Sequence, residues 1–202
     1  MRRYRSGVTV ILLARHGETD WNTERRWQGH ADRPLNDVGR DQARELAETL
    51  AGRTIDVVYS SDLVRAHETA RIVADRLGLP VELDVGLREV DVGDWSGRAH
   101  DEVESVDPEG FRRWQGGGKG WTGGESYDEM GSRVVDTVLR LAEAHPDETI
   151  LIVSHGGSIR ACRAVAEGLS HAGSRMSAVG GMANCEVVEL VVADGRLAMA
   201  AG

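Results

Sequence analysis

The segment that decides the fold is Leu12-Leu13-Ala14-Arg15-His16-Gly17-Glu18-Thr19-Asp20-Trp21-Asn22. It continues an apolar run that begins at Val8, a pattern that predicts a strand, and the strand ends where Gly17 permits a turn. Arg15 and His16 therefore stand at the carboxyl end of a strand, where α/β proteins place their chemistry. An imidazole at this point can act as a base, a metal ligand or a nucleophile, and the neighbouring guanidinium offers paired donors suited to phosphate or carboxylate.

The composition is typical of one globular domain, which we expect to span residues 1–202. Hydrophobic residues make up 41% of the 202 positions and charged residues 28%, and the chain contains no internal repeat or long linker. The formal net charge of -9 argues against nonspecific binding to nucleic acid or to a membrane surface. An anionic substrate would therefore need a local basic pocket.

Three features predict a cytoplasmic protein. The apolar run from Val8 to Ala14 is short and leads directly into Arg15 and His16, so we interpret it as a strand and not as a secretory signal. No apolar run approaches the thickness of a bilayer. Cys162 and Cys185 lie in apolar segments without metal-site spacing, which is typical of buried, unpaired thiols in a reducing compartment.

Apolar, β-rich runs alternate with helical patterns, which predicts a layered α/β domain with parallel central strands and an antiparallel edge. The expected strands are residues 8–14, 55–59, 81–83 and 149–153, followed by a hairpin of residues 184–192 and 196–200. The expected helices run from Asn36 to Gly52, from Ser61 to Gly78, from a capping box of Ser126 and Glu129, and from Gly156-Gly157.

The sequence turns glycine-rich between Phe111 and Ser126, which predicts a mobile surface loop. Trp114 and Trp121 are unfavourable in water, so a lid over an active site is the alternative to a plain solvent loop. We expect this lid or loop to span about residues 98–125.

Four segments together suit the binding and transfer of a phosphoryl group. They are Arg15-His16-Gly17 with Asn22, Ser60-Ser61-Asp62 with Arg65, Leu87-Arg88-Glu89 with Gly93-Asp94-Trp95, and Ser154-His155-Gly156-Gly157. Each has a plainer explanation when taken singly: a core histidine at His155, a solvated loop residue at Glu89, or an ion pair of Arg65 with Asp62 or Glu68. Their joint occurrence at strand ends indicates one site, where helix N-termini would aim free amides at an anion.

At these residues the chain resembles the histidine phosphatase superfamily, also called the phosphoglycerate mutase-like family, and in particular its phosphatase branch. The resemblance spans nearly the whole chain and implies a three-layer α/β/α sandwich, with a mostly parallel central sheet and an antiparallel edge strand. It implies that His16 attacks phosphorus and becomes a phosphohistidine, while its other ring nitrogen donates to a backbone carbonyl. Glu89 would serve as general acid and base, with no metal or other cofactor.

The resemblance also implies which residues form the site. The catalytic residues would be Arg15, His16, Arg65, Glu89 and His155, and the substrate-binding residues Arg15, Asn22, Gln28, Gly29, Arg65, His155 and Gly156. Thr19 is balanced between this pocket and a local capping role. The tryptophans at 21, 27, 95, 114 and 121 either stack on a sugar or other bulky leaving group, or pack the core and anchor the loop.

We therefore predict a metal-independent phosphomonoesterase for small phosphorylated metabolites. One alternative is a phosphoglycerate mutase-type phosphotransferase, but the insert after Glu89 is short, and its only basic pair, Arg112-Arg113, also suits a solvated helix face. A metal-dependent hydrolase is disfavoured because Arg15 and Arg65 would repel a cation. A catalytically inactive module that binds phosphate ligands is the remaining alternative, and the complete set of catalytic residues argues against it.

Residues 179–185 resemble the corresponding stretch of actinobacterial members that act on glucosyl-3-phosphoglycerate. That ester is one candidate substrate, and an unspecified small phosphomonoester is the broader expectation. Members of the family are often dimers, and the apolar edge hairpin would supply an interface for a homodimer.

Overall fold

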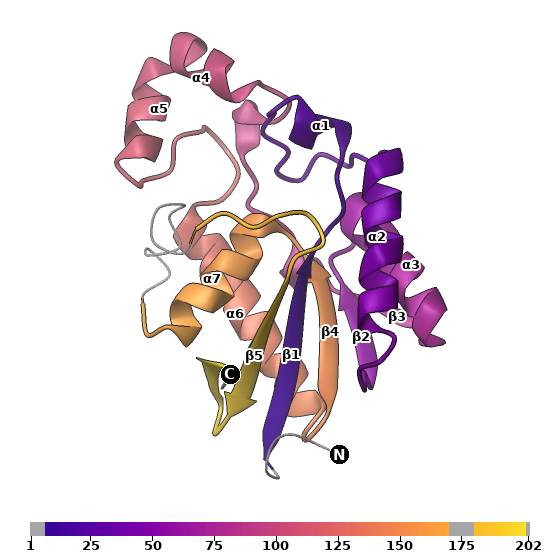
Figure 1. Cartoon of the computed structure of the whole chain (residues 1–202). Helices are drawn as coiled ribbons and strands as arrows, with labels where there is room; N and C mark the ends of the chain where they lie inside the picture. The colour runs from indigo at the N-terminus through magenta and orange to yellow at the C-terminus, as the bar shows by residue number, and fades with distance from the viewer. Residues whose placement is uncertain (1–6, 170–179, 201–202) are drawn as a thin grey trace.

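The computed structural model describes residues 7–169 and 180–200 of the chain, and within them one sheet of six strands runs in the order β3-β2-β4-β1-β5-β6. The strands are β1 (Val8–Arg15), β2 (Val57–Ser60), β3 (Val81–Leu83), β4 (Thr149–Ser154), β5 (Val187–Ala193) and β6 (Arg196–Met199). β3, β2, β4 and β1 are parallel, whereas β5 and β6 are antiparallel to their neighbours at one edge (Figure 1). The mostly parallel sheet with an antiparallel edge is therefore confirmed.

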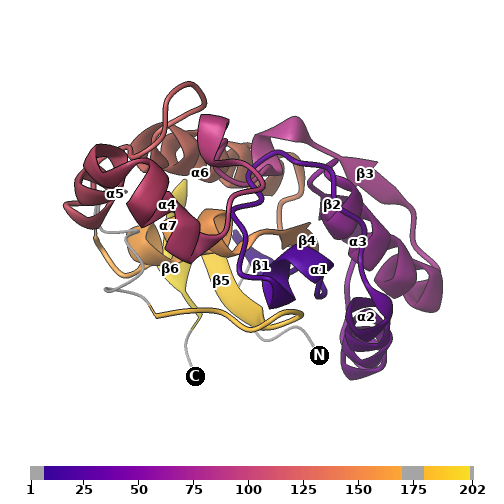
Figure 2. The same ribbon diagram turned by 90° about the horizontal axis from the view of Figure 1, so that it is seen from above.

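Helices cover both faces of the sheet. The α-helices are α1 (Asp20–Thr23), α2 (Asp37–Leu50), α3 (Val64–Leu77), α4 (His100–Val106), α5 (Pro108–Gln115), α6 (Tyr127–Ala144) and α7 (Gly156–Ala166), with short 3₁₀ helices η1 (Val85–Leu87) and η2 (Gly93–Trp95). α2 and α3 pack on one face, and α6 and α7 pack on the other (Figures 1 and 2). This arrangement confirms the three-layer sandwich. None of the helices in the described ranges combines the length and apolar character needed to cross a membrane.

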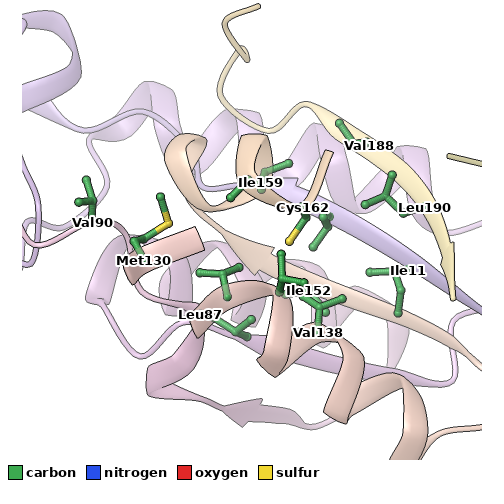
Figure 3. Close-up of a cluster of buried hydrophobic side chains, with 14 of the residues drawn as sticks. Ile11, Leu87, Val90, Met130, Val138, Ile152, Ile159, Cys162, Val188 and Leu190 are labelled. Carbon is green, nitrogen blue, oxygen red and sulfur yellow. The ribbon is translucent and has the colours of Figure 1, made fainter. Parts of the chain in front are cut away.

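β1 is mostly apolar, as expected of a strand with both faces buried. Ile11 and Leu13 face the core under α6 and α7, while Leu12 and Ala14 face the core under α2 and α3. Figure 3 shows the first of these cores, where Ile11 of β1 lies among side chains from the sheet, α6 and α7. Burying one side chain of this size contributes about 1.5–3 kcal/mol, so β1 is held firmly in the middle of the sandwich.

The edge hairpin forms as predicted but starts later than residue 184. Residues 183–186 form a turn in which the Ala183 amide donates to Glu186 Oε2 at 2.7 Å and Cys185 adopts a φ of 57°. Asp194 and Gly195 then connect the two strands with φ values of 50° and 69°, the left-handed pair that a two-residue hairpin turn requires.

Two of the predicted helix caps are confirmed and one is wrong. The Asn36 side chain accepts from the Gly39 amide at 2.8 Å, and Ser126 and Glu129 form the capping box that opens α6. Ser61 does not cap α3, which begins at Val64 after Leu63. Ser61 instead uses its hydroxyl in the site described below.

The prediction of a loop between Phe111 and Ser126 is wrong for its first residues. Phe111 to Gln115 belong to α5, which starts where Asp107 caps the helix and Pro108 takes its first position. The glycine-rich part is anchored, since Trp121 is only 2% exposed and its Nε1 donates to the Glu125 carbonyl at 2.9 Å. A plain solvent loop is therefore excluded for the part that holds Trp121, and the lid stays a prediction.

Both cysteines are free thiols, as predicted, but only Cys162 is fully buried. Cys185 is partly exposed, contrary to the expectation of two buried thiols. Burial raises the pKa of each thiol to about 12, so neither is a ready nucleophile.

Candidate active site

The sheet register brings His16 and His155 together. Arg15 at the end of β1 pairs with Ser154 at the end of the parallel strand β4, so the next residue on each strand lies at the same edge. The two imidazole rings are 5.2 Å apart between centroids and inclined at 61°. His16 is 4% exposed and His155 is fully buried. The joint position of the two histidines follows directly from their places after neighbouring parallel strands.

His16 has the hydrogen-bond geometry expected of a nucleophile. Its Nδ1 lies 2.7 Å from the Gly17 carbonyl oxygen, an acceptor, so Nδ1 carries the hydrogen and Nε2 keeps a free lone pair. Burial, followed by the charges of Arg65 and Arg15, lowers the pKa of His16 well below its ordinary value of 6.5. The imidazole is therefore neutral at neutral pH, and its free nitrogen is available for attack.

Arg65 is held as a buried cation by carbonyl oxygens alone. Its Nη1 donates to Ala31 O at 2.9 Å and its Nη2 to Gly29 O at 2.8 Å, while Nε has no partner among the described residues. Burial lowers its pKa to about 10, which still leaves the guanidinium charged at neutral pH. A charge buried without a carboxylate partner is unfavourable by itself and is stabilised when an anion binds.

The helical ion pairs that would have given Arg65 a plainer role are absent. Asp62 pairs with Arg88, and Glu68 pairs with Arg40. Arg15 is likewise held by a carbonyl, that of Met182, and its buried Nε has no partner within the described part of the chain.

His155 is fully buried beside His16 and is not on the wall of the cavity described below. Its Nε2 is 2.9 Å from Ser61 Oγ, and its buried Nδ1 has no partner among the described residues. Burial and the charge of Arg65 are the two largest causes that lower its pKa well below 6.5, so this imidazole is also neutral. Ser61 accepts from the Leu63 amide at 3.3 Å, which leaves its own hydrogen for His155 Nε2. In that tautomer the unpartnered Nδ1 carries a hydrogen and is a donor.

Backbone amides hold the carboxylate of Glu89 in place. Oε2 accepts from the Gly157 amide in the first turn of α7 at 2.9 Å, and Oε1 accepts from the Val90 amide at 3.0 Å. A Cβ atom added to Gly157 would lie only 2.2 Å from Glu89 Oε1. The absence of a side chain at 157 is therefore what allows the carboxylate to reach the helix N-terminus.

Arg133 on α6 fixes the segment that carries Glu89, and sequence reasoning missed this role. Its Nη1 donates to the carbonyls of Gly86 at 2.9 Å and Arg88 at 3.1 Å, and its Nη2 to the carbonyl of Glu89 at 3.3 Å. It also pairs with Glu125. The sequence around Arg133 does not predict these contacts, because the three carbonyls that it binds are 44 to 47 positions away in the chain.

Three further side chains bind the same run of carbonyls. They are Ser154 on Leu87 at 2.7 Å, Ser158 on Arg88 at 2.9 Å and His30 on Glu89 at 2.8 Å. Each carbonyl from Gly86 to Glu89 thus has a side-chain donor, which limits the freedom of the acid/base candidate.

A cavity of about 310 Å³ opens above His16, and we call it the phosphate cavity. Of the residues predicted for the site, the ones on its wall are Arg15, His16, Asn22, Gln28, Gly29, Arg65, Glu89 and Gly156. Asn22 Oδ1 accepts from the Thr19 amide at 3.0 Å, which leaves the Asn22 amide hydrogens for the cavity. Thr19 is the N-cap of α1 and does not line the cavity, but its hydroxyl lies 3.2 Å from Oε1 of the cavity residue Gln28, so it has the local role and also contacts the pocket.

The tryptophans mainly pack against each other. Trp27 is 5.2 Å from both Trp95 and Trp114, and Trp95 is 5.5 Å from Trp121. Trp21 lies on the cavity wall, with the Arg33 guanidinium 5.0 Å from its ring centroid. Anchoring of residues 93–125 is thus the common role, and Trp21 and Trp27 also face the cavity.

Two negative findings concern alternatives raised by the sequence. Arg112 and Arg113 are exposed on α5 and do not line the phosphate cavity. Within residues 7–169 and 180–200, no group of three or more His, Cys, Asp or Glu side chains is arranged to hold a metal ion.

The chain is similar to known proteins over most of its length. The family model described as histidine phosphatase superfamily (branch 1) matches residues 11–201. The chain is 43% identical over 155 residues to phosphoglycerate mutase-like protein 4 of Arabidopsis thaliana, and the aligned region covers 74% of this chain and 67% of the relative. It is 38% identical to the glucosyl-3-phosphoglycerate phosphatase of Mycolicibacterium vanbaalenii, over 91% of this chain and 84% of that one. A solved structure described as mycobacterial hydrolase 1 superposes with a TM-score of 0.86 at 33% identity, covering 96% of this chain and 97% of that one.

Proposed function

The chain belongs to the histidine phosphatase superfamily and is a phosphoric monoester hydrolase, and on this premise we propose that it acts through a phosphohistidine on His16 with Glu89 as general acid and base. The observation that carries the proposal is the bond from His16 Nδ1 to the Gly17 carbonyl at 2.7 Å. It directs the lone pair of a neutral imidazole from Nε2 into a cavity lined by Arg15 and Arg65.

The first half of the reaction transfers the phosphoryl group to the protein. His16 Nε2 forms a bond to phosphorus while the bond from phosphorus to the ester oxygen breaks, and that oxygen leaves with a proton from Glu89. Arg15 and Arg65 bind the phosphoryl oxygens, because their guanidiniums have no carboxylate partner among the described residues to compete with the ligand. Asn22, Gln28 and the amides of Gly29 and Gly156 complete the donor set.

The second half returns the protein to its starting state. Glu89, now ionised, takes a proton from a water molecule as the water oxygen attacks phosphorus, and the bond to His16 Nε2 breaks. The amides of Gly157 and Val90 that hold the carboxylate suit its ionised form in this step. His155 lies beside His16 and supports both halves through its Nδ1, a donor without a partner among the described residues.

We favour hydrolysis without a metal over the alternatives. The two guanidiniums beside His16 supply the positive charge that a metal would bring and would repel one. An inactive binding module would need neither a nucleophile fixed in one tautomer nor a carboxylate fixed above it. The substrate is a small phosphomonoester, and glucosyl-3-phosphoglycerate, named for the Mycolicibacterium relative, belongs in the first screen beside sugar phosphates.

The decisive experiment is a search for the phosphoenzyme in the presence of a chelator. We expect label from a ³²P-phosphomonoester to appear on wild-type protein and to disappear with H16A, whereas H67A, which removes a partly exposed histidine outside the cavity, retains it. E89Q should form and lose the label more slowly with alkyl than with aryl phosphates. Near-normal turnover by H16A, or complete loss of wild-type turnover in chelator, would refute the mechanism. Formation of the other isomer from a phosphoglycerate would indicate a mutase.

We further propose that the protein is a cytoplasmic homodimer. The free thiols suit a reducing compartment, and β6 at the sheet edge, with Met199 39% exposed, offers a surface for a second copy. Light scattering at micromolar concentration measures the mass, and fractionation of cells tests the location.

A further inference from the structure

A second hollow adjoins the phosphate cavity on the side of α4 and α5, and we call it the outer hollow. It has a volume of about 310 Å³. Its wall consists of Glu24, Arg25, Trp27, His100, Asp101, Glu104, Phe111 and Trp114. Arg25, Trp27 and His100 also line the phosphate cavity, so the two spaces meet at these three residues. In Figures 1 and 2, α4 and α5 lie beyond the carboxyl ends of the parallel strands, on the same side of the sheet edge as α1.

The two spaces differ in charge. The phosphate cavity has five guanidiniums on its wall, those of Arg15, Arg25, Arg26, Arg65 and Arg160. The outer hollow has three carboxylates and one guanidinium, that of Arg25, and of the carboxylates Glu24 pairs with Arg26. Asp101 and Glu104 form no ion pair in the described part of the chain and are exposed. These two carboxylates are therefore hydrogen-bond acceptors without an ion-pair partner among the described residues.

The outer hollow also has an aromatic wall. The rings of Phe111 and Trp114 are 5.5 Å apart and inclined at 37°, and Trp27 meets Trp114 edge to face at 5.2 Å. Flat aromatic surface beside acceptors for hydroxyl hydrogens is the combination that binds one face of a sugar ring by stacking and its rim by hydrogen bonds.

The residues shared by both spaces add polar groups that lack partners. Trp27 is 7% exposed, and its Nε1 has no hydrogen-bond acceptor among the described residues. A buried donor of this kind calls for a partner, such as a ligand oxygen. The His100 ring stacks on Trp27 at 4.4 Å, and burial, followed by the charge of Arg25, lowers its pKa. His100 is therefore neutral at neutral pH and can both donate to and accept from hydroxyl groups.

We propose that the outer hollow binds the leaving group of the substrate and selects a hydroxyl-rich one, in the first instance a sugar. This inference rests on the proposed function, since the phosphate must lie over His16 for the leaving group to extend past Trp27. Groups without hydroxyls fit this wall less well. An anionic group without them meets Asp101 and Glu104, a cationic group meets Arg25 on the shared wall, and an apolar group would desolvate two carboxylates without replacing their hydrogen bonds.

The test compares three esters on the full chain: phenyl phosphate, phosphocholine and trehalose 6-phosphate. We expect wild type to have a higher kcat/KM for trehalose 6-phosphate than for the other two. The variant D101N/E104Q should lower kcat/KM for the sugar ester by about tenfold, mainly through KM, because two charge-assisted hydrogen bonds become weaker. Phenyl phosphate should change less than about twofold.

A matched control variant removes the same number of negative charges at positions that line neither the phosphate cavity nor the outer hollow. E109Q/E143Q neutralises one carboxylate in a first helical turn and one farther along a helix, as D101N/E104Q does, and it should leave all three esters unchanged. W114A tests the aromatic wall in the same way, with a folding check by circular dichroism.

Three other outcomes would contradict the proposed role of the outer hollow. A preference for phosphocholine that D101N/E104Q abolishes would assign the hollow to a cation. Equal kcat/KM for phenyl and sugar esters, or equal losses for both in D101N/E104Q, would show that the hollow does not contact the leaving group. If wild type hydrolyses none of the esters, the proposed function falls as well, whereas hydrolysis of phenyl phosphate with no sugar preference overturns the hollow alone.

Discussion

Replacement of Gly157 by alanine should disable Glu89 without unfolding the protein. The added Cβ would lie 2.2 Å from Glu89 Oε1, and ordinary van der Waals contact begins at 3.4 Å, so the carboxylate must retreat by roughly 1 Å. Backbone strain does not arise, because Gly157 is not among the glycines with positive φ. Alanine also favours a helix over glycine by up to about 1 kcal/mol, so the free energy of unfolding should stay constant or rise slightly.

The expected kinetic effect follows from what Glu89 contributes. A displacement of about 1 Å can lower a rate about 100-fold, and general acid catalysis as a whole is worth about 10² to 10⁴. We therefore expect G157A to lower kcat/KM for glycerol 3-phosphate about 100-fold. With p-nitrophenyl phosphate the loss should stay below about threefold, because that phenolate leaves without a proton and kcat/KM reports only the first transfer.

Two controls make the test specific. G156A places a Cβ 3.7 Å from Arg15 Nε, the nearest atom outside its chain neighbours and its own helix backbone, so it should change both substrates by the same small factor. The double variant G157A/E89Q should be little slower than E89Q alone, since both changes remove one function. Wild-type activity of G157A on the alkyl ester, or additive losses in the double variant, would refute the role given to the Gly157 contact.

Two further predictions concern the electrostatics and support of the site. Burial lowers the pKa of His16 and His155 below 6.5, so at acid pH the unfolded chain binds more protons than the folded one. The free energy of unfolding should therefore fall as pH drops below about 6.5, by up to about 1.4 kcal/mol per pH unit for each histidine. Urea titrations at pH 7.5 and 5.5 measure this fall, and an unchanged pH dependence in H16Q/H155Q would contradict the prediction. R133M should lower kcat/KM for alkyl phosphates about tenfold more than for aryl phosphates, because the segment that carries Glu89 loses the donors of Arg133. Equal losses for both classes would mean that Arg133 acts only on stability.

The parts of the fold and site that could be predicted depend on local sequence and strand order. β1 and β4 are buried on both faces, so they are continuous apolar runs, and the histidines that follow them meet because parallel strands end at one edge. His16 alone could have been a base, a metal ligand or a nucleophile, and the prediction of a nucleophile also needed Arg65, Glu89 and His155. The structure adds the hydrogen bond to the Gly17 carbonyl, which fixes the tautomer of His16.

The parts that could not be predicted depend on contacts across the chain. Arg133 looks like an ordinary polar position of α6 until the fold brings the 86–89 carbonyls beside it. Serine is a residue type typical of helix caps, yet the Ser61 hydroxyl contacts His155, which follows β4. α5 could have been found from Asp107 and Pro108, the cap and first-turn residues typical of a helix start, but the glycines that follow concealed it.

The clustering of the tryptophans determines what fluorescence can report about this protein. All five lie between residues 21 and 121, and the strands, α2, α3, α6 and α7 contain none. Rings about 5 to 6 Å apart, such as those of Trp27, Trp95 and Trp121, exchange excitation energy, so their emission behaves as one signal from the region beside the two cavities. A fluorescence-detected melt would therefore follow the loosening of that region, while far-ultraviolet circular dichroism follows the sandwich. Coincident transitions by the two methods would mean that the region unfolds together with the sheet.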